Sequence, residues 1–235
     1  MTRNARLLIV EDEAAIRDGL VDVFVYHGFA VDSCGDGNVA LEKALTGRYD
    51  LILLDVMLPG MNGFDICDAI RARDRDQPII MLTAKSSDEE IIQGLKLGAD
   101  DYVAKPFSIQ QLVLRVEAVL RRSEAGRLEA DTISLMSGVV IDTRNLNGRA
   151  ADDELTFTRR EIDILQYLAA HSARAVPREE LLNKVWGYAR NLDIETRTVD
   201  IHIAKLRRKI ETNPKEPGNL ITVRGAGYRL LITSR

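Results

Sequence analysis

Short aliphatic runs alternate with helix-like segments through the first half of the chain, and polar or charged residues follow most of these runs. Strands are predicted near 6–10, 30–34, 50–54, 79–82 and 102–105, and helices near 13–27, 37–46, 63–74, 87–97 and 108–122. Strands this apolar are typical of a parallel sheet covered by helices on both faces. The pattern favours a doubly wound α/β fold over an eight-stranded barrel, which needs about twice as many residues.

Polar side chains stand where four of these strands end. Glu11 and Asp12 follow the first strand, Asp55 the third, Thr83 the fourth and Lys105 the fifth. Because the carboxyl ends of parallel strands share one edge, we expect these side chains to meet there. Mg²⁺ prefers carboxylate, water and phosphate oxygens, and it offsets the charge that builds up in phosphoryl transfer. The pattern therefore predicts a Mg²⁺ pocket in which an aspartate carries a phosphoryl group contacted by Thr83 and Lys105.

The acidic residues of this pocket have separate predicted roles. Asp12 and Asp55 are expected to bind Mg²⁺ directly, together with the main-chain carbonyl of Met57, while Glu11 acts through water. Crowding three carboxylates without a cation raises at least one of their pKa values. Asp55 stands alone after the central strand and is the predicted phosphoacceptor.

The charge of the chain is divided unevenly. Residues 1–122 hold 14 Lys/Arg and 20 Asp/Glu, a net charge of −6, whereas residues 178–235 hold 12 and 7, a net charge of +5. An acidic first part and a basic last part indicate two domains, one attracting a cation and the other a polyanion. Neither a secretory signal nor an apolar run of about 20 residues is evident, so a cytoplasmic protein with no membrane contact is expected. Cys34 and Cys67 are expected to be buried free thiols.

The strand–helix alternation stops after residue 122. We predict a first, α/β domain over 1–122, a linker over 123–130 and a second, α+β domain over 131–235. The second domain is expected to begin with strands near 132–136, 139–142 and 155–157, with turns at Gly138 and at Asn147-Gly148. Helices follow from a capping box at Thr158 and Glu161, then near 178–186 and 196–211, and a hairpin around 224–227 closes the chain.

The helix predicted over 196–211 has two unlike faces. Its apolar face carries Val199, Ile203, Leu206 and Ile210, and its opposite face carries Arg197, Ile201, Ala204 and Arg208, flanked by Thr198 and Lys205. The opposite face contains no acid, and an exposed isoleucine is costly unless a partner covers it. Insertion into the DNA major groove explains both features, because arginine binds phosphates or guanine edges and isoleucine contacts a thymine methyl.

The first domain resembles the receiver domains of bacterial two-component response regulators. The resemblance covers residues 5–122 and rests on the runs Val10–Glu13, Leu54–Gly60, Leu82–Ala84 and Gly98–Phe107. It implies that a phosphohistidine on a sensor histidine kinase donates the phosphoryl group. It also implies that phosphorylation draws Thr83 toward the phosphate while the aromatic side chain of Tyr102 turns inward.

The resemblance further implies a symmetric homodimer on phosphorylation. Asp101 and Arg115 match one recurring ion pair of the usual dimer face, formed by the fourth helix, fifth strand and fifth helix. Lys96 and Glu117 reverse the usual order of acid and base. Because their charges are still opposite, a salt bridge between them across the dimer interface is still expected to be feasible. We therefore expect the same dimer with a different pairing code.

The second domain resembles the winged helix of the OmpR/PhoB subfamily over about 130–232. The resemblance rests on the runs 178–182, 185–187, 197–200, 206–209 and 222–229. It implies DNA contacts by Arg207, Thr222, Arg224 and Tyr228, with Arg224 entering the minor groove from the wing. The loop Gly187–Glu195 corresponds to a stretch that touches RNA polymerase in some relatives.

These observations predict a phosphorylation-activated transcription factor rather than an enzyme, and two alternatives stay open. A phosphatase working through an aspartyl-phosphate usually carries a second acid two residues after its nucleophile, where this chain has Met57. A regulator that binds DNA regardless of phosphorylation is the other alternative. Dinucleotide binding is disfavoured because no G-x-G-x-x-G run follows the first strand.

Overall fold

The structure is a computed structural model that describes residues 5–83, 98–124, 131–151, 153–188 and 197–233. The chain divides into two compact units, Met1–Glu124 and Ala125–Arg235, each of which is described separately. The helix expected near 87–97, and with it Lys96, lies outside the described residues. The last helix of the first unit runs to Glu124, two residues into the predicted linker, because its helical hydrogen bonding continues past residue 122.

The first unit is an α/β sandwich whose elements follow the predicted order. Its elements are β1 Arg6–Val10, α1 Ala14–Tyr26, β2 Ala30–Cys34, α2 Gly37–Ala44, β3 Leu51–Asp55, α3 Gly63–Arg73, β4 Ile79–Thr83, β5 Asp101–Ala104 and α5 Ile109–Glu124. Among the described residues the five strands pair in the order β2-β1-β3-β4-β5, and every pairing is parallel. The order changes direction between β1 and β3, where open α/β sheets bind ligands.

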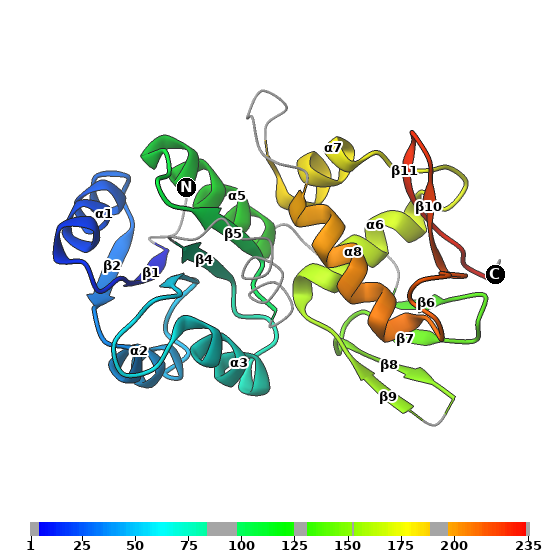
Figure 1. Cartoon of the computed structure of the whole chain (residues 1–235), viewed down its shortest axis with the longest axis horizontal. Helices are drawn as coiled ribbons and strands as arrows, with labels where there is room; N and C mark the ends of the chain where they lie inside the picture. The colour runs from blue at the N-terminus through cyan, green and yellow to red at the C-terminus, as the bar shows by residue number, and fades with distance from the viewer. Residues whose placement is uncertain (1–4, 84–97, 125–130, 152, 189–196, 234–235) are drawn as a thin grey trace. The chain divides into compact units, whose positions relative to one another are not determined.

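Helices cover both faces of this sheet (Figure 1). On one face, alternate residues of β1, β3 and β4 pack with the apolar sides of α1 and α5 in a single buried cluster. α2 and α3 lie on the other face. Burial of β1, β3 and β4 on both faces explains why their sequences are almost continuously aliphatic.

Two helix starts pack directly against the loops that carry the acidic residues. A Cβ on Gly63, the first residue of α3, would lie 2.1 Å from the main-chain oxygen of Asp55, so only glycine fits at this position. A Cβ on Gly37, the first residue of α2, would lie 1.9 Å from the main-chain oxygen of Met61. These contacts fix the loop after β3 at the ligand-binding edge of the sheet.

The second unit begins with an antiparallel sheet and ends with a hairpin. Its elements are β6 Thr132–Ser134, β7 Val140–Asp142, β8 Asn147–Ala150, β9 Asp153–Thr156, α6 Arg159–Ala170, α7 Arg178–Leu181, a π-helical turn η1 Leu182–Trp186, α8 Arg197–Ile210, β10 Leu220–Val223 and β11 Gly227–Leu230. The hairpin pairs β10 with β11 beside α8, as a winged helix requires (Figure 1). The buried side chain of Trp186, the single tryptophan of the chain, lies in this unit.

The predicted turn at Asn147-Gly148 is wrong. Both residues belong to β8, and the chain reverses earlier, where the Asp142 carboxylate accepts hydrogen bonds from the main-chain N–H groups of Arg144 and Asn145. Gly148 is required for packing instead, because a Cβ there would lie 2.9 Å from the Val140 carbonyl oxygen. The predicted turn at Gly138 is present, with a φ of 89°.

The capping box that starts α6 is confirmed. The Thr158 side chain accepts from the main-chain N–H of Glu161, and the Glu161 carboxylate accepts from the main-chain N–H of Thr158. Phe157 and Ile162, which flank the box, are both buried. This start fixes α6, which packs against β6, η1 and β11.

A surface cluster at the end of α6 generates a pH prediction. Hydrogen bonds from Arg174 and from the Tyr167 hydroxyl lower the pKa of Glu180 to about 2. A carboxylate with a lowered pKa stabilises the folded state above its ordinary pKa, and that stabilisation is lost as the pH falls toward the lowered value.

Glu180→Gln should therefore lower the free energy of unfolding of the second unit at neutral pH. The difference from the wild type should shrink as the pH falls from 4.5 toward 2, because the unfolded wild-type chain protonates Glu180 over this range while the folded chain does not. Urea unfolding followed by Trp186 fluorescence measures this difference. Glu179→Gln, at an exposed neighbouring position, is the control; an equal and pH-independent loss in both variants would contradict the prediction.

Candidate functional site

Three carboxylates meet at the carboxyl edge of the first unit's sheet, as predicted. Oxygens of Glu11, Asp12 and Asp55 lie within 4.8 Å of one another. Glu11 is fully buried and Asp55 is 3% exposed, whereas Asp12 faces solvent. An all-oxygen donor set with one open side fits the coordination that Mg²⁺ prefers.

The ammonium group of Lys105 joins two of these carboxylates. Its Nζ lies 2.6 Å from Asp55 Oδ2 and 2.6 and 2.8 Å from the two carboxylate oxygens of Glu11. Lys105 follows β5, and its peptide bond to Pro106 is cis. The sequence-based prediction placed Lys105 beside Asp55; its equally close contact with Glu11 was not predicted.

The pKa values show how strongly these groups depend on one another. Burial raises the pKa of Glu11, the Lys105 ammonium opposes that rise, and the charge of Asp55 adds to it, so the net shift is upward. Burial alone would lower the pKa of Lys105, but its hydrogen bonds to Asp55 and Glu11 outweigh burial and raise it. The pKa of Glu11 is raised, as expected for at least one carboxyl group of the pocket, but burial contributes more to the rise than the neighbouring charge of Asp55 does.

The remaining predicted pocket residues lie nearby. Met57, two residues after Asp55, is exposed, and its main-chain N–H donates to Asp55 Oδ1 at 3.1 Å. Thr83 is the last residue of β4 and is buried beside Asp55, since Leu82 pairs with Asp55 in the sheet. Tyr102 is buried in β5 and pairs with Met81.

Arg17 is a pocket residue that the sequence analysis missed. From α1 its guanidinium donates to the main-chain oxygens of Glu11 and Asp12, at 2.8 and 3.2 Å. A Cβ on Gly35 would lie 2.6 Å from the same guanidinium, so the absent side chain leaves room for it. Its acceptors are main-chain oxygens, which leave no side-chain pattern in the sequence.

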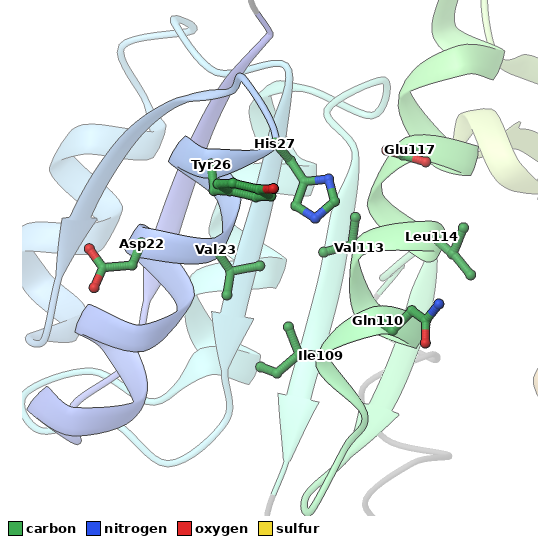
Figure 2. A pocket seen from close by; sticks show the side chains of 9 residues that line it. All are labelled: Asp22, Val23, Tyr26, His27, Ile109, Gln110, Val113, Leu114 and Glu117. Atoms are coloured by element: carbon green, nitrogen blue, oxygen red, sulfur yellow. The ribbon is translucent and has the colours of Figure 1, made fainter.

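A shallow apolar groove runs between α1 and α5 (Figure 2). Its lining residues are Asp22, Val23, Tyr26, His27, Ile109, Gln110, Val113, Leu114 and Glu117. Figure 2 shows Ile109 and Val113 projecting from α5 toward α1. Tyr26 is 88% exposed at the end of α1. A second depression lies alongside, between the first turns of α1 and the segment Lys105–Phe107.

The residues predicted for the dimer face have different environments in the structure. Asp101 and Arg115 form an ion pair within one chain, and both side chains are largely buried. Glu117 lines the groove between α1 and α5, and Lys96 lies outside the described residues. The structure therefore leaves Asp101 and Arg115 already paired before any second copy approaches.

The predicted DNA-facing strip of α8 is narrower than expected. Ala204 and Arg208 are exposed, but Ile201 is only 8% exposed and Thr198 is also buried. The expectation of an exposed Ile201 is wrong, because its neighbours in the unit already cover most of the side chain. The side chain of Arg197 lies outside the described residues.

Lys205 points into the unit rather than outward. Its ammonium lies 3.2 Å from the carboxylate of Glu161 on α6, and its side chain is 11% exposed. The expected outward placement of Lys205 is therefore wrong: a fully buried carboxylate draws the ammonium toward it.

The wing residues fall into an exposed and a buried group. Thr222 and Arg224 are exposed on the hairpin. Arg207 reaches from α8 to the wing, donating to the Leu220 carbonyl oxygen and to Thr222 Oγ1, both at 2.8 Å.

Tyr228 is buried at the base of the wing. Its hydroxyl donates to Asp200 on α8 at 2.6 Å, and the guanidinium of Arg178 lies over its ring. Burial and this hydrogen bond raise the pKa of Tyr228 to about 12. The hydroxyl predicted to contact DNA is thus held within the unit.

Two family models match the chain. The model of the response regulator receiver domain matches residues 7–117, and the model described as "Transcriptional regulatory protein, C terminal" matches residues 152–230. The chain is a two-component response regulator of the OmpR/PhoB subfamily. It joins a receiver domain to a winged-helix DNA-binding domain and controls transcription.

Proteins similar along nearly their whole length support this assignment. The alkaline phosphatase synthesis transcriptional regulatory protein SphR of Synechococcus elongatus is 40% identical, with 96% of this chain and 91% of SphR covered. The sensory transduction protein RegX3 of Mycobacterium tuberculosis is 41% identical, with 95% and 98% covered. The DNA-binding response regulator MtrA of the same organism is 41% identical, with 97% of each chain covered.

Solved structures show the same fold. A mutant form of RitR matches with a TM-score of 0.72 and 29% identity over 96% of this chain and 98% of that one. DrrB, an OmpR/PhoB homologue from Thermotoga maritima, matches with a TM-score of 0.52 and 28% identity over 97% and 100%. In the described residues no helix is both long and apolar enough to span a membrane.

The shared ammonium generates a stability prediction. Lys105→Met should lower the free energy of unfolding of the receiver by about 3–5 kcal/mol, because it leaves two buried carboxylates without their counter-ion. The loss should shrink as the pH falls, because a carboxyl group with a raised pKa takes up a proton more readily in the folded state.

Hydrogen exchange of the β1 and β3 amides reports on this unit alone. Lys43→Met is the matched control, since its ammonium donates to the Ser33 carbonyl oxygen outside the carboxylate cluster. Equal losses in the two variants, or a loss that grows as the pH falls, would refute the role given to Lys105.

Proposed function

We propose that the receiver accepts a phosphoryl group on Asp55 from a sensor histidine kinase, or from a small acyl phosphate, with Mg²⁺ as cofactor. The observation that carries the proposal is the contact of Asp55 with both an acidic cluster and the Lys105 ammonium. An isolated buried aspartate would have neither a cation site nor a positive charge to receive phosphoryl oxygens.

In the transfer step an oxygen of Asp55 attacks the phosphorus while the bond from phosphorus to the donor breaks. The bonding electrons leave with the donor, as the imidazole of phosphohistidine or the carboxylate of an acyl phosphate. Bound Mg²⁺ would supply positive charge to the phosphoryl oxygens, and Glu11, Asp12, Asp55 and the Met57 carbonyl would hold it. The chain thus acts on itself and is not a metabolic enzyme.

Lys105 and Thr83 have complementary tasks in this proposal. The ammonium stabilises the Asp55 carboxylate before transfer and stays within reach of the phosphoryl oxygens afterwards. Thr83 ends the neighbouring strand, where its hydroxyl can donate to the same oxygens. Movement of Thr83 coupled to the buried Tyr102 would report phosphorylation to the α5 side of the receiver.

Phosphorylation is proposed to favour a homodimer that places two winged helices on neighbouring half-sites of promoter DNA. Joining two weakly binding winged-helix domains in one dimer makes the second DNA contact intramolecular. This raises the effective concentration of the second domain at its half-site. The exposed side chains of Arg208, Thr222 and Arg224 support direct contact with DNA. Arg197 is included on the helical pattern of the sequence alone. Contact of RNA polymerase with the loop Gly187–Glu195 rests on the resemblance alone, and residues 189–196 lie outside the described residues.

Asp55→Asn should abolish phosphorylation by acetyl phosphate in the presence of Mg²⁺, because the neutral amide lacks the anionic carboxylate oxygen that attacks phosphorus. Intact-mass spectrometry measures the phosphorylated fraction, and peptide mapping locates the group. Asp68→Asn, which neutralises an exposed acid on α3, should phosphorylate like the wild type. Phosphoryl groups on another residue, or unchanged labelling of Asp55→Asn, would refute the proposal.

Acetyl phosphate and Mg²⁺ should convert the wild-type chain from monomer to dimer, and Asp55→Asn should remain monomeric under the same conditions. Size-exclusion chromatography with light scattering measures the molar mass directly. Persistence of the monomer at high concentration, with phosphorylation verified by mass, would exclude the dimer while leaving the phosphoacceptor assignment intact.

A further inference from the structure

The last two turns of α8, the proposed recognition helix, contain four basic residues, but few of them are exposed at the surface. These residues are Lys205, Arg207, Arg208 and Lys209. Within the described residues only Arg208 among the four is exposed and makes no ion pair. Arg207 is turned to the wing, where its partners are neutral oxygens.

Both lysines converge on one buried carboxylate. Glu161 on α6 is fully buried; Lys209 Nζ lies 2.6 Å from its Oε2 and Lys205 Nζ lies 3.2 Å from its Oε1. Lys209 also donates to the Thr156 carbonyl oxygen at 2.8 Å and lies over the Phe157 ring. Each lysine therefore has a fixed internal partner rather than a solvated end.

The balance of charges explains why the lysines stay inward. Burial alone would raise the pKa of Glu161, but Lys205, Lys209 and the capping hydrogen bond outweigh burial and lower it. The carboxylate is therefore charged at neutral pH. Moving either ammonium into water would leave a buried charge only partly compensated, which is unfavourable.

We propose that Glu161 determines which basic side chains of α8 reach DNA. It does so by holding the ammonium groups of Lys205 and Lys209 away from the phosphate backbone. Phosphate contacts raise affinity for all sequences alike, whereas base contacts carry discrimination. Withholding two lysines thus weakens non-specific binding and leaves recognition to the exposed strip and the wing. Glu161 is a specificity-determining residue that does not itself contact DNA.

The test measures binding of the full-length, unphosphorylated chain to a fluorescein-labelled, random-sequence duplex at a series of salt concentrations. In Glu161→Gln the neutral amide no longer holds the lysines, so they turn outward and reach phosphates. The slope of log affinity against log salt should steepen by about 0.9 for each released lysine, up to about 1.8. Affinity at low salt should rise accordingly.

Glu179→Gln is the matched control, because it removes the same charge from an exposed position in the same domain. The slope of log affinity against log salt should change by less than half of the change seen in Glu161→Gln. Trp186 fluorescence verifies that each variant is folded. A folded Glu161→Gln with the wild-type slope, or one matched by Glu179→Gln, would overturn the proposal.

A second comparison decides the question even if Glu161→Gln does not fold. Lys205→Gln leaves Lys209 on Glu161 and should keep the wild-type slope, since the ammonium it removes is held inside the unit. Arg208→Gln removes an exposed basic side chain and should flatten the slope of log affinity against log salt by about 0.9. Equal flattening in Lys205→Gln and Arg208→Gln would show that Lys205 contacts phosphate, and the proposal would fail.

Discussion

The ammonium of Lys105, shared by Glu11 and Asp55, is the interaction on which the receiver site depends. Two buried carboxylates at the end of neighbouring strands would repel each other and take up protons without a nearby positive charge. The Lys105 ammonium supplies that charge to both Glu11 and Asp55, while the solvent-facing Asp12 leaves one side of the cluster open. We propose that the same ammonium also receives the charge of a phosphoryl group on Asp55.

The winged helix also contains a buried carboxylate that is paired with ammonium groups. Glu161 is a buried carboxylate that binds two ammonium groups, and it also caps the helix that carries it. On the opposite flank of α8, the Tyr228 hydroxyl and the guanidinium of Arg178 both bind Asp200. Polar contacts thus hold side chains on both flanks of α8 within the unit, and we propose that this confines DNA recognition to the exposed strip between them.

The receiver site was predictable from the sequence because topology alone brings its members together. These residues stand at the ends of four apolar strands: Glu11 and Asp12 after β1, Asp55 at the end of β3, Thr83 at the end of β4 and Lys105 after β5. The carboxyl ends of parallel strands share one edge of the sheet, so the fold alone brings these residues together. Arg17 was not predictable, since its acceptors are main-chain oxygens. No local pattern distinguishes an arginine with such acceptors from a solvated one.

The recognition helix was predictable in its bounds and its apolar face but not in its flanks. Helical periodicity gives the direction of a side chain, yet it does not show how far neighbouring elements extend around the helix. Ile201 is covered and Lys205 is drawn inward for this reason, because Glu161 belongs to a helix far away in the sequence. Likewise Asn147-Gly148 has the composition of a turn, while close packing against β7 is what requires Gly148.

The most direct test of the shared ammonium is a ¹⁵N spectrum of the lysine side chains, recorded with and without acetyl phosphate and Mg²⁺. We expect one slowly exchanging Nζ signal, absent from Lys105→Met, that shifts when the receiver is phosphorylated. A Lys105 signal that coincides with those of solvated lysines, and does not move on phosphorylation, would contradict this expectation.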